Sequence, residues 1–80
     1  MNLKPITTEK AIMMIETNNT ITFSVEKIYS KEDIKKEIEE IFKVKIEKVR
    51  THIKRNTKYI YIKLNKENPA IDMATKIGIM

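Results

Sequence analysis

Residues 49–64, VRTHIKRNTKYIYIKL, hold two runs typical of β-strands, joined by the short polar link KRNT at 54–57. The second run alternates apolar residues with polar or aromatic ones: Ile60, Ile62 and Leu64 stand between Tyr59, Tyr61 and Lys63. This alternation predicts a strand with one buried face, because successive side chains of a strand point to opposite sides. Two strands with so short a link predict an antiparallel hairpin.

The first arm of this hairpin changes phase along its length. Its apolar or β-branched positions are Val44 and Ile46 and then, one residue out of phase, Val49, Thr51 and Ile53. A one-residue shift inside a strand predicts a β-bulge, here near Lys48.

A helix and a strand are expected near the N-terminus. Residues 7–17, TTEKAIMMIET, have threonines that can cap a helix, Glu9 in its first turn and apolar residues at helical spacing. Residues 18–27, NNTITFSVEK, open with a turn signal and then alternate, which predicts a half-buried strand. Its expected inward residues are Ile21, Phe23 and Val25, and its expected outward residues are Thr20, Thr22 and Ser24.

Two further helices are expected. In residues 30–43, SKEDIKKEIEEIFK, Ser30 can cap the helix, and one apolar stripe is formed by Ile34, Ile38, Ile41 and Phe42. In residues 68–80, NPAIDMATKIGIM, we expect Asn68 as the cap, Pro69 at the first helical position and Gly78 just past the end. Its expected core residues are Ile71, Ala74 and Ile77.

The order of these elements predicts the fold class. A strand–helix–strand crossover followed by a hairpin favours a split arrangement, in which the last strand lies between the first two and antiparallel to both. We therefore predict an α+β fold: an antiparallel sheet sandwich with a split β-α-β unit plus a hairpin, and helices packed on the sheet. Eighty residues without an internal linker or repeat predict one domain over 1–80.

The composition restricts where the protein acts. The chain has no cysteine, which suits a reducing compartment and excludes disulfides. It shows no signal-peptide pattern and no apolar run of about 18 residues, so we expect a soluble cytoplasmic protein without membrane insertion.

The positive charge is concentrated in one segment. Residues 45–66 contain eight Lys or Arg and a single acid, Glu47, so this segment accounts for the positive excess of the whole chain, whose formal net charge is +5. Such a local excess is the pattern expected for a polyanion-binding surface, whereas the plainer interpretation is a solvated face.

The sequence offers little catalytic chemistry. With one histidine, His52, no cysteine and one glycine, the chain lacks a metal-ligand cluster, a nucleophile pair and a phosphate-cradling loop, so we expect no enzyme, no cofactor and no metal. Tyr59 and Tyr61 can stack on unpaired bases, or they are ordinary surface residues of a strand. The Met13–Met14 pair is expected to fill the core rather than to form a peptide-binding groove.

Several segments together resemble a known family. KPITTEKA at 4–11 is similar to the basic–Pro–x–x–Thr/Ser–Glu–Lys–Ala opening of the L23 family of large-subunit ribosomal proteins, in its compact archaeal-type form. NNTITFSV, SKEDIKKEIEEIFKVKIEKV, YIKL and AIDMATKIGIM follow the rest of the family pattern in order, over nearly the whole chain.

The resemblance implies a structural constituent of the ribosome that binds large-subunit rRNA at the rim of the polypeptide exit tunnel. Implied partners are neighbouring ribosomal proteins and the signal recognition particle or other nascent-chain factors, and the free protein is expected to be a monomer. By carry-over, the residues that match RNA-facing positions are Lys4, Lys10, Lys31, Lys35, Arg50, Lys54, Arg55, Lys58 and Lys63. Glu9 matches a position where factors dock in relatives.

The chain also departs from the family. It has Val49–Arg50–Thr51 where the family usually reads Val–Asn–Thr, and its hairpin is shorter than the one with which bacterial relatives reach into the tunnel. Two alternatives to the ribosomal interpretation are a basic protein-interaction module not tied to the ribosome, which binds an acidic protein, and a small phosphate-handling enzyme.

Overall fold

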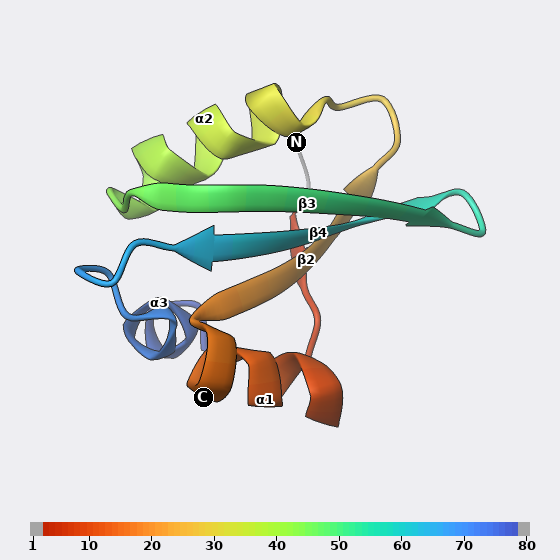
Figure 1. The fold of residues 1–80 in the computed structure, drawn as a ribbon. Helices are drawn as coiled ribbons and strands as arrows, with labels where there is room; N and C mark the ends of the chain where they lie inside the picture. Colours follow the sequence, from red (N-terminus) through yellow and green to blue (C-terminus); the bar gives the residue numbers. More distant parts are fainter. Residues whose placement is uncertain (1–2, 79–80) are drawn as a thin grey trace.

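The structure, a computed structural model, describes residues 3–78 of the predicted 1–80 domain, so residues 1–2 and 79–80 lie outside the described part. The elements in chain order are β1 (Lys4–Pro5), α1 (Glu9–Asn18), β2 (Thr20–Glu26), α2 (Lys31–Phe42), β3 (Ile46–Lys54), β4 (Thr57–Leu64) and α3 (Ala70–Lys76). Three helices on a four-stranded sheet confirm the predicted α+β class (Figure 1).

The sheet has the order β1-β2-β4-β3, and all its pairings are antiparallel. The prediction that the last strand lies between the other two long strands is therefore confirmed. The two-residue strand β1 was not predicted; it pairs Lys4 with Ser24 and Pro5 with Phe23. Proline is tolerated there because an edge strand leaves one side of its backbone unpaired.

The hairpin turn is tighter than the predicted four-residue link. Only Arg55 and Asn56 lie between the strands, with φ angles of 50° and 65°. Positive φ at both central residues is the mark of a type I′ turn, whose twist matches that of the flanking strands. Lys27 Nζ donates a hydrogen bond to Asn56 Oδ1 at 3.1 Å, which ties the turn to the end of β2. The register of β3 shifts between Ile46 and Lys48, which confirms the predicted bulge.

All three helices contribute to one core on one face of the sheet. Figure 1 shows α2 along β3 and shows α1 and α3 together beside β2, with the hairpin extending beyond the helices. The sheet contributes Ile21, Phe23, Val25, Ile60, Ile62 and Leu64 to this core. The helices contribute Ile15, Ile34, Ile38, Ala70, Met73 and Ala74.

Two helical core predictions are wrong. Ile41 is 57% exposed, because the row of α2 that faces the sheet consists of residues 34, 38 and 42 and Ile41 lies beside it. Ile71 is 46% exposed, because α3 turns its small residues Ala70 and Ala74 inward together with Met73.

The predicted cap of α3 is also wrong, and a residue far away in sequence replaces it. The N-cap position is Pro69, and the Asn68 side chain instead accepts a hydrogen bond from the Lys45 N–H at 2.8 Å. The first N–H of α3, on Ala70, donates to Oδ1 of Asn19 at 2.6 Å. At the other end, Gly78 has φ 83° just past the helix, as predicted.

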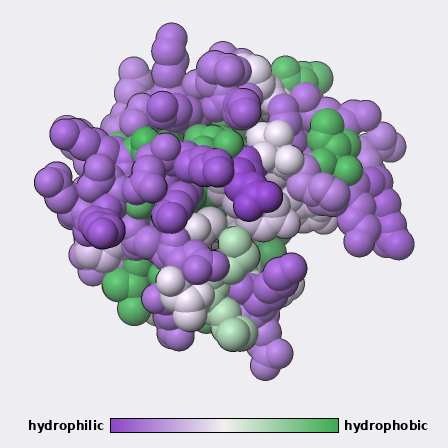
Figure 2. All heavy atoms as spheres, viewed as in Figure 1, coloured by the Kyte–Doolittle hydropathy of each residue, from purple (hydrophilic) through white to green (hydrophobic). Residues whose placement is uncertain are grey.

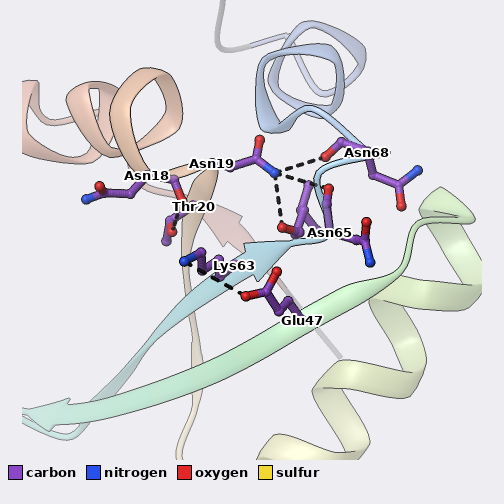
Figure 3. A network of polar contacts seen from close by, with 8 residues as sticks. Asn18, Asn19, Thr20, Glu47, Lys63, Asn65 and Asn68 are labelled. Carbon is purple, nitrogen blue, oxygen red and sulfur yellow. Dashed lines mark hydrogen bonds and ion pairs between the residues drawn. The ribbon is translucent and has the colours of Figure 1, made fainter.

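Asn19 thereby connects three elements (Figure 3). Its backbone ends α1 in the left-handed region, with φ 49°. Its Nδ2 donates to the carbonyl oxygens of Leu64, Asn65 and Asn68 at 3.0, 3.2 and 3.3 Å. A single amide side chain therefore joins the end of α1, the end of β4 and the start of α3.

Candidate nucleic-acid interface

The second face of the sheet has no core and carries basic and aromatic side chains. In β4 these alternate residues are Tyr59, Tyr61 and Lys63. The antiparallel register with β3 places His52 opposite Tyr59, Arg50 opposite Tyr61, and Lys48 opposite Lys63. Residues directly opposite on one face of a sheet are in side-chain contact range, so each tyrosine has a cationic or imidazole neighbour. We call this surface the open face.

α1 forms a wall along one side of the open face. Lys10, Met14 and Asn18 recur every four residues, so they share one side of the helix, while Ala11 and Ile15 are buried on another. This wall explains why two predicted outward residues, Thr20 and Thr22, are only 5% and 4% exposed. They do lie on the face away from the core, but the open face is covered at β2.

Between the α1 wall and β3 lies a groove of about 570 Å³, lined by Lys10, Met14, Asn18, Thr20, Lys48, Arg50, Thr51, His52, Tyr61 and Lys63. A hollow of about 280 Å³ extends it toward the hairpin, where Thr22, Lys54 and Tyr59 join the lining. The two hollows share Lys10, Met14, His52 and Tyr61, so they form one continuous groove.

The groove is positively charged. Five cations line it, and no aspartate or glutamate of residues 3–78 does: the cations are Lys10, Lys48, Arg50, Lys54 and Lys63. Within the described range a single ion pair occurs, between Lys63 Nζ and Glu47 Oε1 at 3.9 Å, with both side chains about half exposed. Most of the surface visible in Figure 2 is hydrophilic, and the apolar side chains form small, separate patches on it. Apart from Lys63, the cations of the groove have no acidic partner among the described residues and are available to an anionic partner.

The structure brings four of the predicted RNA-binding residues together in this groove, namely Lys10, Arg50, Lys54 and Lys63. Two more lie close to it. Lys4 is paired with Ser24, which puts it on the open face at the edge strand, and Arg55 is exposed in the hairpin turn.

The remaining predicted residues lie elsewhere. Lys58 lies on the core side of β4 and is half-buried, because its Nζ donates to the carbonyl oxygen of Tyr29 at 2.7 Å. Lys31 and Lys35 are exposed on α2, which packs on the covered face. Glu9 is exposed in the first turn of α1, one residue before Lys10.

Several residues that line the groove were not among the predicted site residues, including Lys48, His52, Met14 and Asn18. After the bulge, Lys48 and His52 alternate in step with Arg50 and so lie on the same face of β3. This alternation is the sequence signal from which they could have been predicted. Met14 and Asn18 had no local signal, because only the docking of α1 on β2 turns them toward the strands. The expected core role of the methionine pair is wrong: Met13 is 60% exposed, and Met14 is half-buried in the groove wall.

Residues 3–78 contain no group of three or more His, Asp or Glu side chains placed to hold a metal ion. In the same part of the chain, none of the helices has the length and apolar character needed to cross a membrane.

The fold and the groove together define a small basic α+β protein with one helix-covered and one open sheet face. Residues 1–70 match the family model described as "Ribosomal protein L23". The chain is also 42% identical over 78 residues to the large ribosomal subunit protein uL23 of Methanothermobacter thermautotrophicus, an alignment that covers 96% of this chain and 91% of the relative. The chain therefore belongs to the ribosomal protein L23 family. This membership confirms the predicted family and the predicted location in the large subunit of the cytoplasmic ribosome.

Proposed function

We propose that this protein is a non-enzymatic structural constituent of the large ribosomal subunit that binds rRNA through the open face and the hairpin turn. The observation that supports this most strongly is the groove itself, which five cations and no acid line within the described residues. Family membership supports the choice of rRNA over other polyanions.

The proposed mechanism is electrostatic. Alternate residues of a strand are about 6.6 Å apart, so Lys48, Arg50 and Lys54 can meet separate phosphate groups along one side of the groove. Lys10 and Lys63 meet others from α1 and β4. Each neutralised phosphate releases a counterion, which favours binding at low salt, and the rigid sheet fixes the spacing of the cations.

The salt dependence of binding tests this mechanism. With the five groove cations, Lys4 and Arg55, about six to eight phosphates are neutralised, so the logarithm of the affinity should fall against the logarithm of the salt concentration with a slope of about −4 to −7. The measurement is titration of the purified protein onto large-subunit rRNA at several salt concentrations. A slope near zero would contradict the mechanism.

A finer proposal concerns the position in the subunit. The resemblance supports a place at the rim of the exit tunnel, beside neighbouring ribosomal proteins, with Glu9 in the docking site for the signal recognition particle or other nascent-chain factors. Glu9 is exposed and adjoins Lys10 of the groove, so a factor docked there would lie next to bound rRNA.

Charge reversal at Glu9 tests the docking role. Ribosomes that carry Glu9→Lys should bind the signal recognition particle more weakly in a co-sedimentation assay, while the variant still assembles into large subunits. Unchanged binding of the particle would contradict the docking role and leave rRNA binding standing.

Family membership argues against the alternative of a module not tied to the ribosome. Sedimentation of cell extract separates the two: the chain should travel with large subunits and leave them after ribonuclease treatment. Recovery with an acidic protein after complete RNA digestion would favour the alternative.

A further inference from the structure

We propose that the groove between α1 and β3 is a binding site for unpaired RNA nucleotides, whose bases stack on Tyr61 and Tyr59. This inference rests on the proposed rRNA binding and deepens it. It assigns to the open face a contact with bases in addition to contacts with phosphates.

The two tyrosines are placed as a stacking platform. They are alternate residues of the central strand β4, about 6.6 Å apart along it, and both are half-buried in the lining of the groove. Their cross-strand neighbours are Arg50 and His52, whose guanidinium and imidazole groups are planar. Aromatic rings and guanidinium planes on an open sheet are the groups on which unpaired RNA bases stack.

The dimensions of the groove favour single bases over a helical stem. Its larger hollow, about 570 Å³, has the size of sites that accept small molecules. The α1 wall, with Lys10, Met14 and Asn18, stands on one side and β3 on the other. We expect a stem to rest its phosphates on the rim and an unpaired nucleotide to enter the groove.

A buried hydroxyl in the lining points to the same kind of ligand. Oγ1 of Thr22 has no hydrogen-bond partner in the described structure, although the residue is only 4% exposed and lines the groove next to Tyr59 and Tyr61. An unsatisfied buried polar atom is costly, and the polar edge of a base could satisfy it. Because the hydroxyl is covered in the free protein, a neighbouring side chain must shift for this contact to form.

The charges complete the site. Lys10, Lys54 and Lys63 stand around the tyrosines, so a nucleotide can place its base on the ring and its phosphate on a cation. A cationic groove with an aromatic platform is the general design of single-strand binding surfaces.

Tyrosine fluorescence provides a direct test, because the chain has three tyrosines and no tryptophan. Tyr29 lies against the core on the other face, so Tyr29→Phe leaves Tyr59 and Tyr61 as the emitting groups. The probes are a single-stranded oligoadenylate and the duplex that it forms with oligouridylate. Single-stranded oligoadenylate should quench the emission of Tyr29→Phe strongly, and the duplex should quench it much less.

A matched set of variants measures how much stacking on the two tyrosines contributes to the affinity for single-stranded RNA. The double variant Tyr59→Leu, Tyr61→Leu should bind single-stranded oligoadenylate about tenfold to a hundredfold more weakly, with an unchanged salt slope, because stacking involves no counterion release. Its affinity for the duplex should change by less than about threefold. Tyr59→Phe, Tyr61→Phe keeps the rings and should bind like the natural chain.

The outcomes are distinct. Absence of quenching by single-stranded oligoadenylate, or equal losses for single strand and duplex in the leucine variant, would overturn the stacking site while salt-dependent RNA binding stands. Absence of salt-dependent binding to both probes and to rRNA would instead contradict the proposed function. If the leucine variant fails to fold, the quenching of tyrosine emission in Tyr29→Phe still tests the stacking site, because that variant leaves the groove unaltered.

Discussion

The two faces of the sheet are made by alternate residues of the same strands, yet they have different chemistry. On the covered face Ile60 and Ile62 are fully buried under the helices. On the open face Tyr59 and Tyr61, their direct neighbours in sequence, are half-buried beside cations. With the proposed rRNA binding, we expect a division of roles, in which stability depends on the covered face and binding on the open face. Substitutions should therefore affect either the free energy of unfolding or the affinity for RNA.

The largest effect is expected on the covered face. Ile62→Ala removes a fully buried side chain from the central strand and should lower the free energy of unfolding by about 2–5 kcal/mol. The free energy of unfolding of a domain of this size is roughly 4–12 kcal/mol in total, so the variant loses much of its stability. Urea unfolding followed by circular dichroism measures the change.

Ile28→Ala is the control for this prediction, because Ile28 is 82% exposed and its loss should cost less than about 0.5 kcal/mol. Equal effects at the two positions would show that burial does not separate the faces as described.

The next effect is expected at Asn19, which joins α1, β4 and α3 outside both faces. Asn19→Ala leaves one N–H and three carbonyl groups without this partner and should cost about 2–3 kcal/mol of unfolding free energy. Thermal or urea unfolding checks this value. Asn18→Ala, at an exposed neighbouring position, should change stability little, and a cost as large as that at Asn19 would argue against the connecting role.

On the open face the expected effect is on binding. Lys48→Gln, Arg50→Gln should weaken rRNA binding about tenfold or more and make the salt slope shallower by about 2, since each lost phosphate contact contributes about 1. The free energy of unfolding should stay within about 0.5 kcal/mol, because both side chains are exposed.

The matched control is Lys36→Gln, Lys76→Gln, which removes the same charge from helix positions outside the groove. If this control weakened binding as much as the groove variant, net charge and not the open face would govern affinity.

The smallest effect is expected at Glu47, which forms the long, half-exposed ion pair with Lys63. Glu47→Gln should release Lys63 for RNA and raise the affinity about twofold to threefold, with little change in stability, because exposed pairs contribute at most about 1 kcal/mol. Titration at low salt measures the gain. A loss of affinity would mean that Glu47 positions Lys63 for binding.

The alternation of residues along the strands could be predicted locally, and it determined most of the fold. Ile60, Ile62 and Leu64 share a phase, so their common burial followed from the sequence, and so did the hairpin, the bulge and the central place of β4. The same phase places Lys58 on the core side, where its ammonium group donates to the Tyr29 carbonyl, although the family resemblance had grouped it with the RNA-binding residues.

The sequence by itself determined the α+β class, the ribosomal family and the concentration of cations at 45–66, because periodicity, motif order and charge are properties of neighbouring residues. Only the tertiary structure decided that α1 forms a wall over Thr20 and Thr22, that Asn19 caps a helix 51 positions away, and that Met14 and Asn18 line a groove. The physical reason is that a helical pattern specifies which residues share a side. What that side meets depends on how segments distant in sequence pack together.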